Sequence, residues 1–408
     1  MLAAKDLINI FPEELLLRIF QYVDKDDLVH SVQHVSPRWH AIAQDNSLWK
    51  DYNYKPPAKT RDKVVSKFLE QSPLLKSFTM SSEMEANEIV DTLCKKCKDL
   101  KTLRINMTSR LNIRLLKGVF TRIPNLECLT ISQAPKKGSK ISVDKCFTVK
   151  FRSYKEAHPQ VFYFTESLNF GVKNCSFIDV IKYVMRRKKE DIISLETNVI
   201  TDDILKLLEG CKGIEKLKLH FDLYQETLKS NIEFIRNFIK LKSLSIIGYF
   251  NDNLMCDLFS KGTMCSVTEL NLIWCIDLSD KSAKSIRLCC PHLETLCLDS
   301  CLKVTDKGIQ ELTKCSELRH IKLSSCPLLT AESVKQVCKC RRITHLDLSS
   351  YFSDINQCSG YLTSAMQLRV LNLRGNTVDD SLLQTLYLNL RNLTQLSVDL
   401  GKACHSSH

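Results

Sequence analysis

Glycine and proline are scarce in this sequence, with 11 and 10 among 408 residues. Their scarcity disfavours a collagen-like chain and an all-β fold that depends on many tight turns. The N-terminal segment also lacks the basic start, apolar run and small-residue cleavage site of a secretory signal. No stretch approaches the roughly 18 consecutive apolar residues that a membrane helix needs. We therefore expect a soluble intracellular protein, cytoplasmic or nuclear, without membrane insertion.

Apolar residues and cysteine are plentiful. Hydrophobic residues make up 44% of the chain, which is enough for a large core, and the length allows roughly two to three domains. The 19 cysteines are an odd number and should stay reduced inside the cell. The net charge of +12 suits nucleic acid, an anionic lipid surface or an acidic protein. Charge alone does not choose among these partners.

A repeated pattern, apolar-x-x-apolar-x-apolar, runs through most of the chain. From Ile214 onward the copies start 27, 26, 26, 25, 25, 25 and 25 residues apart. This period lies within the range of roughly 20 to 29 residues that is typical of leucine-rich repeats. The pattern starts at twelve positions: Leu75, Leu100, Leu126, Ile192, Ile214, Leu241, Val267, Leu293, Leu318, Ile343, Leu368 and Leu393.

Each copy predicts one strand and one helix. Alternate residues of the strand should enter the core, and the residues between them should face outward on a concave surface. A Ser, Thr or Asp then starts a helix, as at Thr305. The 66-residue gap between Leu126 and Ile192 has room for a degenerate copy at Thr165-x-x-Leu168-x-Phe170. The count becomes about thirteen repeats, with a basic insertion near 133–158 that we expect to leave the solenoid as a loop.

The cysteines follow the same period. One group lies three residues before a repeat start, and another lies eight residues after it, where a small residue turns the chain. This pattern resembles the cysteine-containing class of leucine-rich repeats. A zinc site at Cys94-x-x-Cys97 with Cys338-x-Cys340 is the alternative, but these pairs lie about nine repeats apart. We therefore expect buried thiols and no metal. The two groups are Cys97, Cys211, Cys290, Cys315 and Cys340, and Cys275, Cys301 and Cys326.

The segment before the repeats has no such period and predicts three short helices. Pro12 fits the first turn of the first helix, Asp27 fits a cap of the second, and Ser36-Pro37 fits the start of the third. A segment of this size, from Ile10 to Tyr52, is too small for an independent core. Its apolar faces also exceed what three short helices can hide. Part of that surface should therefore bind a partner.

The same segment contains Phe11-Pro12-x-Glu14 with Leu15, Ile19-Phe20, Asp27-Leu28, Val35, Arg38-Trp39 and Leu48-Trp49. This set closely resembles the F-box motif, although Phe11 replaces the usual Leu before the proline and Ser36 replaces a frequent Cys. The alternative is a simple helical cap on the first repeat. The resemblance implies docking to a Skp-family adaptor, which connects to a cullin and a RING subunit. The residues that the resemblance assigns to adaptor binding are Phe11, Pro12, Glu14, Leu15, Ile19, Phe20, Leu28, Val35, Trp39, Leu48 and Trp49.

The fold class that follows is α/β, with a short three-helix F-box and a curved leucine-rich-repeat solenoid behind it. We place the F-box at 8–54, a linker and solenoid cap at 55–72, the solenoid at 73–402 and a tail at 403–408. Aromatic and Arg side chains are frequent anchors of interfaces, although Trp274 suits packing over the next repeat equally well. The candidate substrate-binding residues at outward positions are Phe221, Tyr249, Trp274, Tyr351 and Arg374.

The predicted function is that of a substrate-recognition subunit of an SCF-type cullin-RING ubiquitin ligase, which promotes ubiquitination and proteasomal degradation of bound proteins. The alternative is a leucine-rich-repeat scaffold unrelated to any ligase. No nucleophile elbow, phosphate-binding loop or metalloprotease helix occurs, so we expect no catalysis and no cofactor. The basic run Arg186–Lys189 suits nucleic acid, nuclear import or an acidic substrate, but a solvated helix end is favoured and nucleic acid is disfavoured.

Overall fold

The structure is a computed structural model, and it describes residues 11–49, 52–57, 59–80, 84–107, 111–133, 145–152, 174–221, 232–248, 252–260, 264–351 and 353–399. The chain divides into two compact units, Met1–Ile192 and Ile193–His408. Among the described residues, no helix is both long enough and apolar enough to cross a bilayer.

The first unit begins with more helical pieces than the three predicted. Their starts test the predicted caps. Ser36 caps α4 as predicted, because its hydroxyl accepts a hydrogen bond from the Trp39 backbone N–H. The second cap was predicted wrongly: Asp24 accepts from the Asp26 N–H and starts α3 one turn before Asp27. Pro12 is the N-cap of α2 and not a member of its first turn. The pieces are α2 (Glu13–Gln21), α3 (Lys25–His30), the 3-10 helix η1 (Val32–His34), α4 (Pro37–Ala43) and α5 (Asn46–Trp49).

Five neighbouring strands of the main sheet follow in the described part of this unit. Their order is β1-β2-β3-β5-β6, and the first three pairings are parallel. A short antiparallel pair, β4 (Leu111–Asn112) with β7 (Asn174–Cys175), lies outside this sheet. The strands are β1 (Asn53–Tyr54), β2 (Ser77–Thr79), β3 (Thr102–Asn106), β5 (Cys128–Gln133) and β6 (Lys145–Phe151), and the helices are α6 (Asp62–Gln71), α7 (Ala86–Lys96), α8 (Ile113–Arg122) and α9 (Phe177–Lys188).

Strand β6 corrects the predicted insertion. The region near 133–158 was expected to leave the solenoid as a loop, but Lys145–Phe151 pairs antiparallel with β5. The physical reason is its two-residue alternation, which places Phe147, Val149 and Phe151 on the buried side. The predicted copy at Thr165-x-x-Leu168-x-Phe170 lies outside the described residues.

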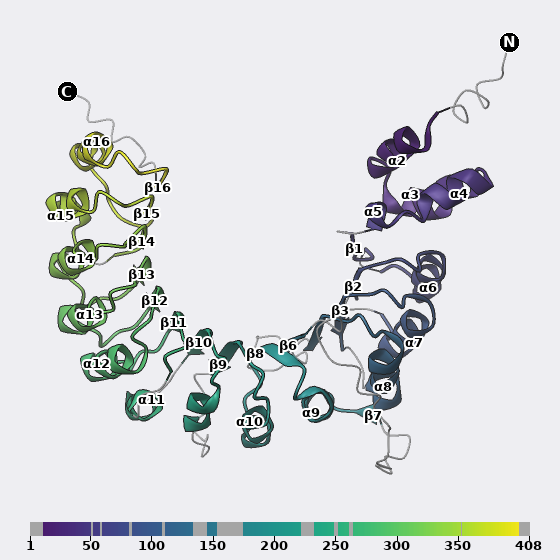
Figure 1. Cartoon of the computed structure of the whole chain (residues 1–408), viewed down its shortest axis with the longest axis horizontal. Helices are drawn as coiled ribbons and strands as arrows, with labels where there is room; N and C mark the ends of the chain where they lie inside the picture. The colour runs from purple at the N-terminus through teal and green to yellow at the C-terminus, as the bar shows by residue number, and fades with distance from the viewer. Residues whose placement is uncertain are drawn as a thin grey trace. The chain divides into compact units, whose positions relative to one another are not determined.

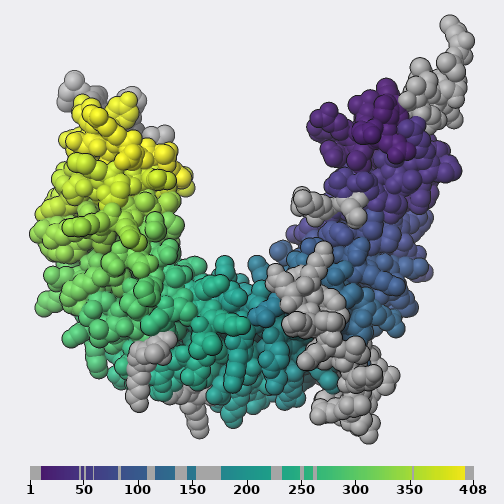
Figure 2. Space-filling model, in the orientation of Figure 1, coloured from purple at the N-terminus to yellow at the C-terminus, as the bar shows by residue number. Residues whose placement is uncertain are grey.

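An aromatic cluster joins the N-terminal helices to the first repeat. Tyr54 stacks on Phe68 of α6 with ring centroids 3.8 Å apart, and His30 of α3 meets the same ring edge-on at 6.0 Å. Trp49 contacts Tyr52 at 6.0 Å. Contacts therefore cross the predicted boundary at residue 54. Figure 2 shows the N-terminal helices in purple, next to the blue repeats of the same unit.

The second unit is a stack of strand–helix repeats. Consecutive strands pair in parallel, and the helices lie on one side of the sheet (Figure 1). The strands are β8 (Ile192–Thr197), β9 (Lys216–Phe221), β10 (Ser243–Gly248), β11 (Glu269–Ile273), β12 (Thr295–Asp299), β13 (His320–Ser324), β14 (His345–Asp347), β15 (Val370–Asn372) and β16 (Gln395–Ser397). The helical pieces are α10 (Asp202–Glu209), η2 (Glu233–Asn237), α11 (Asp252–Phe259), α12 (Asp280–Cys289), α13 (Asp306–Leu312), α14 (Ala331–Cys338), η3 (Ile355–Cys358), α15 (Ser359–Ser364) and α16 (Asp380–Asn389).

The sequence period appears as strand register. Leu296 of β12 lies opposite Ile321 of β13, and Leu346 of β14 lies opposite Leu371 of β15, each pair 25 residues apart. These side chains are at most 3% exposed. A strand begins at, or two residues after, each of the twelve predicted repeat starts. The predicted strands are therefore confirmed, and their inward positions are buried except in the last copy, where Leu396 is 37% exposed.

Two recurring devices connect neighbouring repeats. After the strands, Trp274, Ser300, Ser325 and Ser350 adopt φ values between 50° and 56°, a strained region for residues with a side chain. Cysteines follow the first three of these: the Cys275 thiol lies 3.6 Å from the Ile246 carbonyl and the Cys301 thiol lies 3.5 Å from the Leu272 carbonyl. In a later repeat, Asn376 donates to the Leu348 carbonyl at 2.8 Å. The cysteines thus share the slot that their spacing predicted.

The second device is an aspartate at the start of three consecutive helices, α11, α12 and α13. Asp280 accepts hydrogen bonds from the N–H and the hydroxyl of Thr305 in the next repeat, at 2.9 and 2.7 Å. Asp306 accepts the same two bonds from Thr330, and a third from the Ser333 hydroxyl. Thr305 caps α13 as predicted. These bonds satisfy helix N-termini while they fix adjacent repeats to one another.

Candidate protein-binding surfaces

Helix α2 carries two apolar stripes on different sides. Leu16 and Phe20 are each 1% exposed and enter the core of the first unit. Leu15 and Ile19 are 40% and 44% exposed, and Phe11, just before the helix, is 38% exposed. Because residues four apart share one face of a helix, Leu15 and Ile19 form one continuous stripe. An apolar stripe at a surface, supported by a second stripe in the core, suits a protein interface.

The structure divides the eleven predicted adaptor-binding residues into a surface and its support. Trp49 supports the helices because its indole N–H donates to the Ala43 carbonyl at 2.9 Å. The Trp39 ring packs edge-on against Phe20 at 5.2 Å. The exposed members are Phe11, Pro12, Glu14, Leu15, Ile19 and Val35, the buried ones are Phe20, Leu28, Leu48 and Trp49, and Trp39 is half-buried.

Arg38 holds the exposed Phe11 segment in place. Its guanidinium donates to the Phe11 carbonyl at 2.7 Å and lies 3.9 Å from the Glu13 carboxylate. The start of α2 is thereby attached to α4, although the two lie more than twenty residues apart in the chain. This contact orders the apolar surface before any partner arrives, which lowers the entropy lost on binding.

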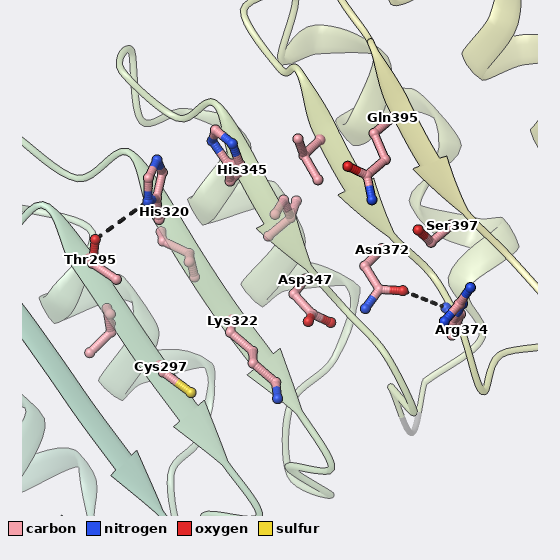
Figure 3. A pocket seen from close by; sticks show the side chains of 14 residues that line it. Thr295, Cys297, His320, Lys322, His345, Asp347, Asn372, Arg374, Gln395 and Ser397 are labelled. Atoms are coloured by element: carbon pink, nitrogen blue, oxygen red, sulfur yellow. Dashed lines mark hydrogen bonds between the residues drawn. The ribbon is translucent and has the colours of Figure 1, made fainter. Parts of the chain in front are cut away.

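A second candidate surface lies on the open face of the sheet in the second unit. A pocket of about 410 Å³ spans β12 to β16, and its lining includes Thr295, Lys322, Asp347, Asn372 and Gln395. These side chains stand at outward strand positions and point away from the helices (Figure 3). Polar and apolar groups from five neighbouring repeats line the pocket, so its shape suits an extended peptide more than a small molecule.

One charged group of this pocket, Lys322, has a carboxylate partner within the chain. Lys322 forms an ion pair with Asp299 at 2.8 Å. Partial burial disfavours the charged Asp299, but hydrogen bonds from Lys322 and Ser300 outweigh it and hold the pKa of Asp299 below its usual range. The rings of His320 and His345 meet at 4.1 Å. Burial, together with His320 and Arg369, lowers the pKa of His345.

The structure separates the five predicted substrate-binding residues. Trp274 is 54% exposed at the end of β11, and Arg374 lines the pocket. Phe221 and Tyr351 were expected at outward positions, but they are only 7% and 5% exposed. Phe221 follows the inward alternation of β9, and the Tyr351 hydroxyl donates to the Thr330 carbonyl at 2.6 Å. Both therefore contribute to the core and not to the surface. Tyr249 lies outside the described residues.

Sequence reasoning also missed several pocket residues. Outward aromatic and charged residues were singled out, so the polar Thr295, His320, Gln395 and Ser397 were passed over. The same 25-residue register that aligns the inward leucines aligns these outward positions. The 25-residue spacing of these polar residues could therefore have identified them from the sequence.

The basic run Arg186–Lys189 lies at the C-terminal end of α9. Arg187 lies 6.0 Å from the Tyr183 ring centroid, and Lys188 lies 5.6 Å from that of Phe120. Lys188 also pairs with Asp191 at 3.3 Å. Cations in the last turn of a helix interact favourably with its dipole. Part of this run therefore has a structural role.

The described cysteines are mostly core residues. Burial raises the pKa of Cys94 to about 11 and that of Cys97 to about 12, which makes either a poor nucleophile at neutral pH. No group of three or more His, Cys, Asp or Glu side chains in the described ranges is arranged to hold a metal ion. The absence of a metal site stays a prediction.

Comparison with known proteins supports both parts of this architecture. Residues 8–55 match the family model described as F-box-like. None of the curated proteins matches the chain. A chain of the crystal structure of the Rad7 and Elc1 complex in yeast is similar in fold, with a TM-score of 0.54 and 18% identity, over 95% of this chain and 88% of that chain. The protein therefore combines an N-terminal F-box-like domain with an open α/β repeat solenoid.

Proposed function

We propose that this protein is a non-catalytic substrate-recognition subunit of an SCF-type cullin-RING ubiquitin ligase. The observation that carries the proposal is the exposed stripe of Leu15 and Ile19, with Phe11 beside it, within the residues that match the F-box-like model. This stripe would bind a Skp-family adaptor. The adaptor would connect the chain to cullin and RING subunits in the cytoplasm or nucleus.

The repeat solenoid would hold the target protein. Its leucine-rich repeats present outward side chains at a spacing of about 4.8 Å from one strand to the next. Trp274, 54% exposed, and Arg374 in the pocket are the predicted anchors that remain accessible. The chain would supply proximity, raising the effective concentration of target lysines near the conjugating enzyme, so that ubiquitination leads to proteasomal degradation.

The similar fold in the Rad7 and Elc1 complex adds support, because there a chain of similar fold forms a complex with a second protein. The competing function is a repeat scaffold unrelated to any ligase. The two differ in one respect that can be measured directly, since only a ligase subunit needs a Skp-family adaptor.

The first test is adaptor binding by single variants of α2. Leu15→Glu and Ile19→Glu each place a carboxylate on the exposed stripe, and we expect either to weaken binding at least tenfold, about 1.4 kcal/mol. Gln21→Glu adds the same charge to another side of the helix and should bind normally. Affinity is measured by calorimetry with a purified Skp-family protein.

Two results would count against the proposal. If the wild-type chain fails to bind the adaptor, the scaffold function replaces it. If Ile19→Glu and Gln21→Glu bind equally well, the α2 stripe is not the docking surface. Because all three substitutions are at exposed positions, each variant should keep the wild-type melting temperature.

A further inference from the structure

The net charge of the chain is confined to one stretch. Residues 101–192 contain 19 Lys and Arg against 7 Asp and Glu, an excess of 12. The remaining residues cancel, so this stretch accounts for the whole net charge of +12. It includes strands β3, β5 and β6 of the first unit. An excess of this size within one stretch of chain creates a local field that attracts anions.

Two of these basic residues, Arg104 and Lys150, lie at outward positions of the first sheet. Strands β3, β5 and β6 alternate between buried and accessible positions, so every second residue faces away from the core. No acidic residue occupies an outward position in the five described strands of this sheet. We call the outward positions of β3, β5 and β6 the basic sheet face: Thr102, Arg104, Asn106, Cys128, Thr130, Ser132, Cys146, Thr148 and Lys150.

Arg104 and Lys150 lie on either side of β5. Arg104 is in register with Thr130, and Lys150 is in register with Cys128. Two strand spacings across the sheet and two residues along it separate their Cα atoms by roughly 12 Å. Cys128 lies between them: burial raises the pKa of its thiol, and the positive charges of Lys150 and Arg104 oppose that rise. Both cations therefore act on the same part of the face.

The side chains of Arg104 and Lys150 are both exposed. Within the described ranges, no carboxylate forms an ion pair with Arg104 or Lys150. The second unit differs, because Lys218 pairs with Glu196 at 2.8 Å on its own sheet face, as Lys322 does with Asp299. Among the described residues, the first unit thus keeps two positive charges on its sheet face that no carboxylate pairs with.

We propose that the basic sheet face binds an extended, Asp- and Glu-rich segment of a target protein. The inference rests on the proposed function, which supplies the target. Carboxylates four residues apart in an extended chain lie on the same side and roughly 13 Å from one another, close to the separation of Arg104 and Lys150. The hydroxyls of Thr130 and Thr148 lie 3.2 Å apart near the two cations, and one donates to the other. The hydroxyl that accepts this bond keeps its own O–H to donate to a further oxygen of the same segment.

The composition of the face favours a peptide over a nucleic acid. Single-stranded nucleic acids are held by aromatic side chains that stack on the bases. No aromatic residue occupies an outward position of the described strands in this sheet, whereas small hydroxyl and thiol side chains leave room for a backbone to approach. A carboxylate-rich peptide needs only cations and donors, and both are present.

The test uses the full-length chain and a fluorescein-labelled dodecapeptide of alternating Glu and Ser, followed by fluorescence anisotropy. The variant Arg104→Gln/Lys150→Gln should raise the Kd for this peptide at least tenfold. The control Arg186→Gln/Lys189→Gln removes the same two kinds of charge from the same stretch, but on the exposed end of α9. It should change the Kd less than twofold. A peptide with Gln in place of every Glu should bind at least tenfold more weakly.

Three outcomes would overturn the inference. The first is an equal loss of peptide affinity in the two double variants, which indicates diffuse attraction. The others are tighter binding, dependent on Arg104 and Lys150, of a twelve-nucleotide single strand than of the Glu-Ser peptide, and binding more than tenfold tighter of a peptide with phosphoserine in place of each Glu. The assay needs no ligase subunits. If the chain binds the adaptor but not the acidic peptide, only the acidic-segment inference is refuted. If it binds the peptide but not the adaptor, only the proposed ligase function is refuted.

Discussion

The two units carry the same repeat but treat charge differently. In the second unit, the outward cations Lys218 and Lys322 have carboxylate partners on neighbouring strands. In the first, Arg104 and Lys150 face outward with no such partner among the described residues. Inward positions must all be apolar for the repeats to stack, so the units agree there. Outward positions are free of that demand, and they are where the units diverge.

The helix side shows a second contrast. Asp306 in the second unit receives three hydrogen bonds from the repeat that follows it. Asp62 of α6 occupies a similar place in the first unit, but the structure shows one bond to it, from the Glu85 N–H at 3.3 Å. The second unit therefore depends more on polar bonds between repeats, and this difference can be measured.

The largest effect should come from placing a carboxylate inside either sheet. Leu103 and Leu296 occupy equivalent inward positions, with 0% and 2% exposure. Leu103→Asp and Leu296→Asp should each destabilise their unit by several kcal/mol, because each buries an unpaired charge. Thr102→Asp and Thr295→Asp at the adjacent outward positions should leave the melts nearly unchanged. Thermal melts with hydrogen exchange check this, and a normal melt for Leu296→Asp would contradict the register.

An intermediate effect should follow from the aspartates at the helix starts. Asp306→Asn should lower the free energy of unfolding by about 1–3 kcal/mol at neutral pH, because it weakens three charge-assisted bonds. Asp62→Asn, with one such bond, should cost less than 1 kcal/mol. Urea unfolding measures both variants. Equal losses would show that the two units use these aspartates alike.

The same aspartate predicts a dependence on pH. Partial burial disfavours the Asp306 carboxylate, but hydrogen bonds from Ser333 and Thr330 outweigh burial and hold its pKa below the ordinary value of 3.8. A carboxyl whose pKa is lower in the folded state stabilises the fold above the unfolded pKa and loses that contribution as pH falls through the folded pKa. The difference between wild type and Asp306→Asn should therefore shrink below about pH 4. A constant difference from pH 7 to pH 3 would argue against these bonds.

The smallest effect concerns the paired and unpaired cations themselves. Lys322→Ala should cost roughly 0.5–1 kcal/mol, as expected for a partly exposed ion pair. It should also raise the pKa of Asp299, which NMR titration can follow. Arg104→Ala removes no ion pair and should change stability by less than about 0.5 kcal/mol. If Arg104→Ala is the more destabilising of the two, the first unit has a partner for this residue and the contrast fails.

Much of the architecture could be predicted from periodicity. The 25-residue step gave the strands and their register, and Ser36 and Thr305 gave two helix caps. Repeats are predictable because each residue contacts mainly its own repeat and its two neighbours. Strand β6 was missed because it pairs antiparallel and lies outside the period.

The surfaces were less predictable. Tyr351 was predicted to be an interface anchor because it is an aromatic residue at the end of a strand. It directly follows Ser350, which has a left-handed backbone conformation, and its ring enters the core. The stripe of Leu15 and Ile19 was recognised as part of an apolar set, but the sequence did not separate it from Leu16 and Phe20. That separation depends on which side of α2 meets α4 and α5, a matter of packing.

The sequence by itself determined the repeat, its register, the inward residues and the F-box-like start, because these depend on local spacing that every copy repeats. Only the tertiary structure decided which apolar side chains of α2 remain outside the core and which outward cations find partners. Both depend on segments far apart in the chain: Arg38 reaches Phe11, and β6 returns to place Lys150 across β5 from Arg104. Local spacing carries no information about such long-range contacts, because side-chain packing and charge pairing are decided only when elements distant in the sequence come together.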